Sequence, residues 1–205
     1  MLSRTSSLVL IAALASMSAF AAKDKPKATN MKLAFDPATS LVKWEGKKVT
    51  GKHNGEIKIK SGELMMAGEE IKGGEFVIDM ATMSNADLTD SAYNKKLITH
   101  LKSDDFFNVE KFPTAVLKIK SAKSVPGFVG PTYEIVGDLT IKGKTNEVKF
   151  PAVVQTKDGK TTATANIVID RTKWEIKYGS GKFFTGLGDK MINDEFQLDV
   201  ALASK

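Results

Sequence analysis

The chain has 205 residues, a formal net charge of +6 and no cysteine, a length sufficient for one domain with a sizeable core. The lack of cysteine excludes disulfide scaffolds, thiolate metal sites and cysteine nucleophiles. Lysines are spread along the chain rather than collected in blocks, so we expect them on solvated faces and expect no nucleic-acid partner.

Residues 1–21 have the pattern of a cleavable secretory signal peptide. Arg4 supplies a positive charge, residues 8–14 are apolar, and Ala19-Phe20-Ala21 fits a small-x-small cleavage site. The apolar run is too short for a membrane-spanning helix. We therefore expect an exported, periplasmic protein that has a flexible lead-in at residues 22–34 and a folded domain at residues 35–205.

Short runs of alternating apolar and polar residues follow one another from Leu41 to Leu202. This period of two indicates strands that each have one dry face. The sequence predicts eight or nine antiparallel strands, and a sheet of that size hides its apolar face and its edges by closing into a barrel. A two-sheet sandwich is the alternative that the pattern leaves open. The expected turns are at Asp36-Pro37, Asn54-Gly55, Ser61-Gly62, Gly143 and Asp158-Gly159.

One helix interrupts the strands. Tyr93, Leu97 and Leu101 are four residues apart and share a helix face, Asp90 or Ser91 can cap its start, and Pro113 prevents any continuation. We expect the apolar face to lie on the sheet or on its open end. Residues 173–193 have no clear period, which predicts either a packed surface loop or a mobile lid over the barrel mouth.

Three motifs, in this order, resemble the YceI-like family: HLKSDDFFNVEKFPTA (100–115), GDLTIKGKTNEVKFP (137–151) and IDRTKW (169–174). The family comprises exported lipocalin-like barrels that are often described as polyisoprenoid-binding proteins. The resemblance implies an all-β, eight-stranded antiparallel lipocalin-like barrel with one α-helix capping an end, and a long-chain isoprenoid or similar lipid as cargo. The family often has an Arg-Asp pair before the His-Leu of the helix. Here Asn94-Lys95-Lys96 occupies that region, so polar contacts there are not carried over.

The dry faces of the strands, the helix and the aromatic residues after it supply the candidate ligand-binding residues. The dry stripe alone fits a filled core equally well, and the resemblance favours a cavity. The candidates are Trp44, Ile57, Ile59, Phe76, Ile78, Met80, Leu97, Leu101, Phe106, Leu117, Ile119, Tyr133, Leu139, Ile141, Phe150, Ile167, Phe196 and Leu198.

Polar side chains receive structural interpretations. His53 and His100 have no cysteine and no carboxylate at ligand spacing, so we expect neither a metal site nor a cofactor. Asp104 and Asp105 fit a solvated or capping role, and the pair Asp170-Arg171 fits an orienting role at a barrel end. No nucleophile, base and orienter are arranged together, so we expect no catalytic residue.

The sequence thus predicts a non-enzymatic binding protein that carries, stores or sequesters a long-chain lipid. One alternative is an enzyme acting on a small apolar substrate in the same cavity, with Tyr133 as its best inward polar residue. Another is a stress-related structural protein with a filled core. A homodimer and a transient contact with a membrane surface both stay open.

Overall fold

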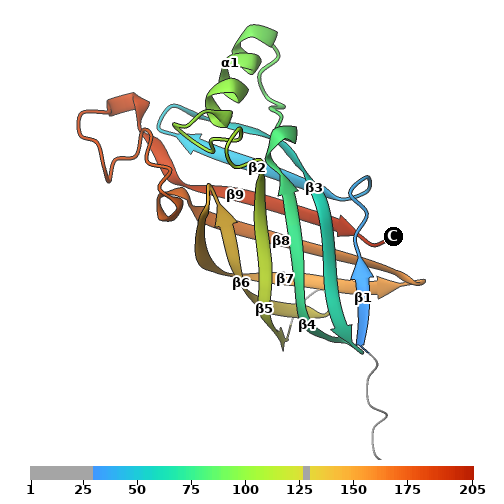
Figure 1. Cartoon of the computed structure of the whole chain (residues 1–205). Coiled ribbons are helices and arrows are strands. Elements are labelled where there is room, and N and C mark those ends of the chain that lie inside the picture. The colour runs from blue at the N-terminus through green and yellow to red at the C-terminus, as the bar shows by residue number, and fades with distance from the viewer. Residues whose placement is uncertain (1–29, 127–129) are drawn as a thin grey trace, which may run out of the picture.

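The computed structural model describes residues 30–126 and 130–205 (Figure 1). The expected signal peptide and residues 22–29 of the expected lead-in lie outside the described residues, whereas Asn30–Ala34 at the end of that lead-in form a strand. The elements are β1 (Asn30–Ala34), β2 (Leu41–Lys48), β3 (Gly51–Ala67), β4 (Glu70–Asp79), α1 (Ser91–Lys102), β5 (Thr114–Val125), β6 (Thr132–Ile141), β7 (Lys144–Lys157), β8 (Lys160–Asp170) and β9 (Ile192–Ala203), with 3-10 turns at Met80–Thr82, Arg171–Trp174 and Gly188–Lys190.

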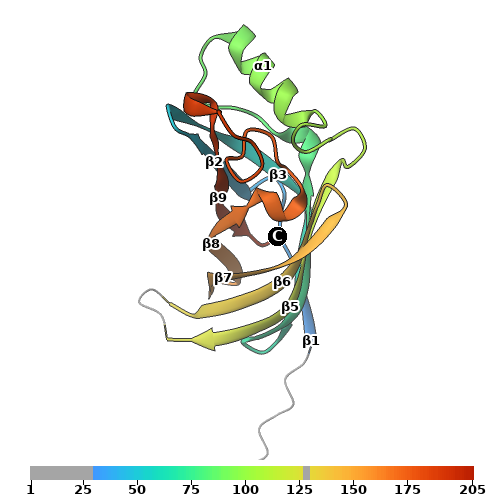
Figure 2. The same ribbon diagram turned by 90° about the vertical axis from the view of Figure 1, so that its left-hand side faces the viewer.

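Within the described residues, β2 to β9 form a closed antiparallel barrel of eight strands. Each strand pairs with its neighbour in sequence, and β9 pairs back onto β2 from Leu41↔Ala201 to Lys48↔Ile192. The short β1 lies beside the second half of β3, with Ala34 opposite Glu63. The continuous ring confirms the predicted barrel and excludes the sandwich. Figure 2 shows the curved wall from the side.

Alternation decides which side chains enter the barrel. Along β6, every second residue from Tyr133 to Ile141 is buried, and β8 likewise buries Ala163 and Ile167 between exposed neighbours. Because successive side chains of a strand point to opposite faces, the apolar set fills one continuous interior. The dry faces that the sequence predicts are therefore the inner wall.

Two of the expected turns are wrong, because both glycines lie inside the long strand β3. Asn54-Gly55 pairs with β2, and the chain reverses earlier, at Val49-Thr50. A Cβ on Gly55 would stand 1.9 Å from the carbonyl oxygen of Ser84. The glycine thus permits a close backbone approach rather than a turn.

The second misplaced turn, Ser61-Gly62, coincides with an irregularity of strand pairing between Ile59 and Ser61. A Cβ on Gly62 would meet the ring of Phe76 at 2.5 Å, so the missing side chain makes room for that ring. The turns at Gly143 and Gly159 are confirmed, with positive φ at Lys142-Gly143 and Asp158-Gly159, as tight hairpins require. Asp36 likewise turns the chain by accepting from the Ala38 amide.

Helix α1 stands over one end of the barrel (Figures 1 and 2). The carboxylate of Asp90 caps it by accepting from the amides of Ala92 and Tyr93. Tyr93 itself is 66% exposed, because only the C-terminal half of the helix reaches the barrel. No helix in the described part of the chain is long and apolar enough to cross a bilayer.

The expected irregular segment has two different halves. Trp174, Ile176 and Ser180 are fully buried, and the Trp174 indole donates to the Leu139 carbonyl at 3.0 Å. Beyond Ser180 the chain is exposed up to Met191, apart from Leu187. The first half is therefore a packed plug against the barrel end, whereas motion of the second half as a lid stays a prediction.

Candidate functional site

The barrel interior below α1 contains a cavity of ≈ 200 Å³, which we call the outer cavity. The surface that faces it is apolar, and its polar residues are at the rim. It is lined by Val42, Trp44, Gly46, Lys47, Lys48, His53, Ile57, Ile78, Met80, Met83, Leu97, Leu101, Phe106, Phe107, Ala115, Leu139, Ile141, Arg171, Ile192, Asn193, Glu195, Phe196 and Leu198. The site thus has an apolar wall and a charged rim.

A second cavity of ≈ 120 Å³, the inner cavity, lies deeper in the barrel. It shares Val42, Ile78, Leu139 and Leu198 with the outer cavity, so the two cavities adjoin. Its exposed surface is also apolar. An elongated apolar molecule that entered past α1 would meet the two spaces one after the other.

The structure places seventeen of the eighteen candidate residues in the walls of these cavities. The inner cavity alone is lined by Ile59, Phe76, Leu117, Ile119, Phe150 and Ile167, and the other candidates line the outer cavity. Tyr133 is the exception, since its ring is buried and its hydroxyl donates to the Glu69 carbonyl at 2.7 Å. Their role as ligand contacts stays a prediction.

Sequence reasoning missed several wall residues. Val42 lies two residues before Trp44 on the same dry face, so its alternation could have identified it. Met83, Phe107 and Ile192 come from irregular segments or strand ends that carry no period. No local signal would have assigned these three residues to the cavity.

A strap formed by residues 80–90 crosses the ends of β2 and β3 and brings Met80 and Met83 to the outer cavity. The Trp44 indole donates to the Ser84 carbonyl at 3.0 Å, and the Ser84 amide donates to the Glu56 carbonyl at 2.9 Å. These bonds fix the Trp44 ring in the cavity wall. The strap passes directly over Gly55, which explains the missing side chain there.

Asp87 fastens the strap to β3. Its carboxylate accepts from the Asn54 amide at 2.8 Å and lies 2.7 Å from His53 Nδ1. Burial by itself would raise the pKa of Asp87, but the hydrogen bonds from Asn54, His53 and Asn85 outweigh it and lower that pKa. A charged Asp87 therefore stabilises the strap and holds His53 at the rim.

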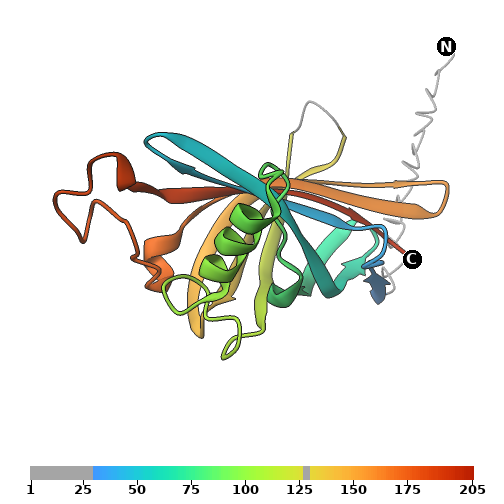
Figure 3. The same cartoon turned by 90° about the horizontal axis from the view of Figure 1, so that it is seen from above.

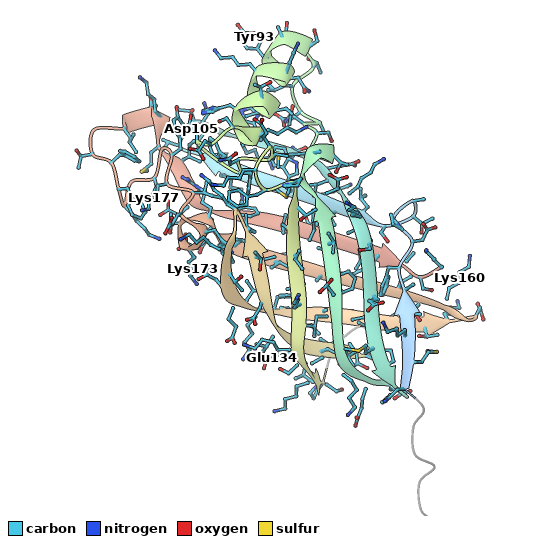
Figure 4. The ribbon with its side chains drawn as sticks, viewed as in Figure 1. Tyr93, Asp105, Glu134, Lys160, Lys173 and Lys177 are labelled. Atoms are coloured by element: carbon cyan, nitrogen blue, oxygen red, sulfur yellow. The ribbon has the colours of Figure 1, made fainter. Side chains whose placement is uncertain are left out.

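His100 belongs to an aromatic cluster rather than to the cavity wall. Its ring lies edge-on to Phe106 at 5.0 Å and to Tyr178 at 4.7 Å, and its Nε2 lies 2.9 Å from Asp105 Oδ2. Figure 4 labels Asp105 at this end of the molecule. The cluster joins α1 to the segment that precedes β9. In the described ranges, no group of three or more His, Cys, Asp or Glu side chains could hold a metal ion.

Arg171 is buried at the rim and organises the start of β9. Its guanidinium donates to the carbonyls of Ile176 at 2.7 Å, Asn193 at 3.0 Å and Ile192 at 3.1 Å. Burial lowers the pKa of Arg171, and the charges of Asp194 and Asp170 oppose that shift. Asp194 Oδ1 lies 3.8 Å from Arg171 Nη2, is buried, and has no hydrogen-bond partner among the described residues.

The neighbouring acidic residues have the structural roles that the sequence predicts. Asp170 caps the 3-10 turn by accepting from the Thr172 amide, and it also binds Lys182 at 3.0 Å. Asp104 accepts from Asn108 at 2.7 Å and lies 3.4 Å from Lys142 Nζ. These contacts fix loops, and neither Asp170 nor Asp104 lines either cavity. The arrangement is suited to burying an apolar chain.

Comparison with known proteins gives a consistent result. The sequence model of the YceI-like domain matches residues 33–203, and no curated protein sequence matches the chain. The structure resembles BcnA from Burkholderia cenocepacia, with a TM-score of 0.64, 23% identity and coverage of 83% of this chain and 99% of that one. It also resembles a polyisoprenoid binding domain from Saccharophagus degradans (TM-score 0.63, 14% identity, coverage 87% and 98%). A third similar structure is the YceI protein of Campylobacter jejuni (TM-score 0.50, 18% identity, coverage 87% and 82%).

Proposed function

The chain belongs to the YceI-like domain family, and from that premise we propose that it binds a long-chain isoprenoid or similar lipid in its barrel. The observation that carries the proposal is the pair of apolar cavities, which lie in series below α1. A structurally similar domain from Saccharophagus degradans is described as polyisoprenoid binding. The protein would hold such a chain for carriage, storage or sequestration.

The cavity volumes set the length of chain that can be buried. The volumes of ≈ 200 and ≈ 120 Å³ together reach the lower end of the roughly 300–1,000 Å³ range of ligand sites. At roughly 30 Å³ per water-sized group, they accommodate about ten methylene-sized groups, or about two isoprene units. A longer chain has to extend out through the rim or widen the space between the cavities.

Burial of this segment is sufficient for useful affinity. About ten groups at about 0.8 kcal/mol each contribute about 8 kcal/mol, which corresponds to a Kd of about 1 μM before ordering costs are subtracted. The charged rim, which includes Lys47, Lys48, His53 and Glu195, would keep a polar head outside the apolar space. The proposal therefore places the chain inside and the head at the rim.

The two alternatives receive less support. The enzymatic one relied on Tyr133, whose hydroxyl is engaged by Glu69 and does not line either cavity. Burial and the charge of Glu69 raise the pKa of Tyr133, which makes it a poorer base at neutral pH. A filled core disagrees with the two cavities, so no observation favours the purely structural role.

The test is direct extraction. Protein purified without detergent from a bacterial host is treated with organic solvent, and mass spectrometry is expected to find a prenyl lipid in near-stoichiometric amount. Lipid-free protein is then titrated with geraniol, farnesol and geranylgeraniol. Affinity should rise strongly up to about two buried isoprene units and more slowly beyond them. Protein that carries no lipid and whose melting temperature does not respond to any of the three alcohols would contradict the proposal.

We also propose export to the periplasm through cleavage near Ala21-Ala22, supported by the pattern of residues 1–21. N-terminal sequencing of the protein recovered from the periplasm tests it. A mature protein that still begins with Met1 would refute this part without touching the lipid-binding proposal.

A further inference from the structure

Exposed apolar side chains gather at the end of the barrel where the outer cavity lies. On the segment 177–191, Tyr178, Phe183, Phe184 and Met191 are exposed, with Phe183 and Phe184 at 47% and 49%. Val49 of the β2–β3 turn is 53% exposed beside them. We call these five side chains the apolar tip. Figure 3 shows the segment projecting beyond the barrel on the side of β2 and β9. Large exposed apolar side chains that gather in this way mark an interaction surface.

The apolar tip is held in an exposed position by backbone hydrogen bonds. The Val49 amide donates to the Met191 carbonyl at 3.2 Å, and the Ile192 amide donates to the Gly179 carbonyl at 2.8 Å. The amides of Phe183 and Phe184 both donate to the Ser180 carbonyl, and Ser180 is fully buried. The two phenyl rings are therefore presented to solvent from an anchored turn.

The charges around the tip are mostly positive. Within the described residues, Lys48, Lys177 and Lys190 make no ion pair, and the ammonium of Lys177 lies 4.9 Å from the centre of the Phe183 ring. Lys182 is neutralised by Asp170 and Asp194. Asp189 is the one acidic residue between positions 177 and 191. Aromatic rings among unpaired lysines suit the headgroup region of an anionic bilayer.

The tip adjoins the rim of the outer cavity. Lys48, the residue before Val49, and Ile192, the residue after Met191, both line that cavity, and they face each other in the β2–β9 pairing. A surface that rests on the tip would therefore lie next to the outer cavity. This continuity links the patch to the exchange of an apolar cargo.

We propose that the apolar tip and its three lysines form a docking surface for anionic phospholipid bilayers, at which cargo enters or leaves the outer cavity. The inference rests on the proposed lipid-binding function for its purpose, but the docking itself is measured separately. Tyr178, Phe183, Phe184 and Met191 enter the interface between headgroups and acyl chains, while Lys48, Lys177 and Lys190 face anionic headgroups.

Vesicle sedimentation tests the docking. The full mature protein is expected to bind phosphatidylglycerol-containing vesicles and to bind pure phosphatidylcholine vesicles much more weakly, with binding that falls as salt increases. F183S/F184S should reduce the partition coefficient at least tenfold. K177A/K190A should reduce it roughly fivefold per lysine at low salt. The matched controls are M31S/V168S, which removes exposed apolar side chains elsewhere, and K157A/K160A at the β7–β8 turn. Figure 4 shows Lys160 far from Lys177.

The readouts separate docking from cargo binding. F183S/F184S changes no cavity-lining residue, so it should retain co-purified lipid while it exchanges that lipid with vesicles at least tenfold more slowly. Wild-type protein that carries lipid but ignores anionic vesicles would overturn the docking and leave the lipid-binding proposal standing. A dimer that F183S/F184S dissociates, seen by analytical ultracentrifugation together with no vesicle binding, would assign the tip to a second copy and also overturn the proposal.

Discussion

Replacement of Ala115 by phenylalanine should close the outer cavity. Ala115 lies on β5 opposite Ile78, is 6% exposed and lines that cavity. The substitution adds about six ring carbons, which at roughly 30 Å³ each nearly match the cavity volume of ≈ 200 Å³. The ring would therefore occupy the space that we assign to the first part of the lipid chain.

The expected loss of affinity follows from the displaced groups. About six methylene-sized places at about 0.8 kcal/mol each amount to about 5 kcal/mol, or more than a thousandfold in Kd. Because the inner cavity lies behind the outer one, access to it should also be lost. A115L adds about three carbons and should lose about half of that free energy.

The assay measures both the amount of bound lipid and the stability of the folded variant. Co-purified lipid per protein, the affinity for geranylgeraniol and the melting temperature are all measured. The melting temperature should stay within a few degrees of wild type if the ring fits the cavity, whereas overpacking would cost roughly 1–3 kcal/mol and lower it further. V168F is the matched control, because Val168 is 57% exposed on β8. Folded A115F that binds as much lipid as wild type would refute the assignment of the chain to this cavity.

Three further predictions concern the parts that shape the site. Gly55→Ala should lower the free energy of unfolding, measured by urea denaturation, by roughly 1–3 kcal/mol, because the new Cβ would stand 1.9 Å from the Ser84 carbonyl oxygen. The control Gly46→Ala, whose Cβ would meet nothing within 4 Å, should lower it less. Arg171→Met should cost at least about 3 kcal/mol in the same assay, because three carbonyls lose their buried donor; a loss below about 1 kcal/mol would contradict the role of Arg171. Because the pKa of Asp87 is lowered in the folded protein, its charge stabilises the fold above the unfolded-state pKa of roughly 3.9, and this stabilisation disappears as pH falls through the folded-state pKa. Asp87→Asn should therefore flatten the fall in the urea midpoint between about pH 5 and pH 3. An unchanged slope would count against the stabilising role of Asp87.

Local patterns predicted most of the barrel correctly. Alternation placed Leu139 and Ile141 on the inner wall, and the spacing of Leu97 and Leu101 found the half of α1 that faces the outer cavity. The predictions failed where the role of a residue is set by a contact with a segment distant in sequence. Gly55 and Gly62 look like turn residues, yet each is small because another segment approaches it. Tyr133 alternates like a wall residue, but its ring is buried away from both cavities.

The sequence by itself determined most of the strands, the faces they turn inward and the amphipathic helix, because these depend on spacings within a few residues. Only the tertiary structure decided how the ring closes from β9 onto β2, how the strap over Gly55 fixes Trp44, and how far the inner side chains leave space unfilled. The physical reason is that a cavity is the difference between the room enclosed by eight strands and the volume of side chains from all of them. The apolar tip also depends on the tertiary structure, since Val49 and Met191 become neighbours only when the barrel has closed.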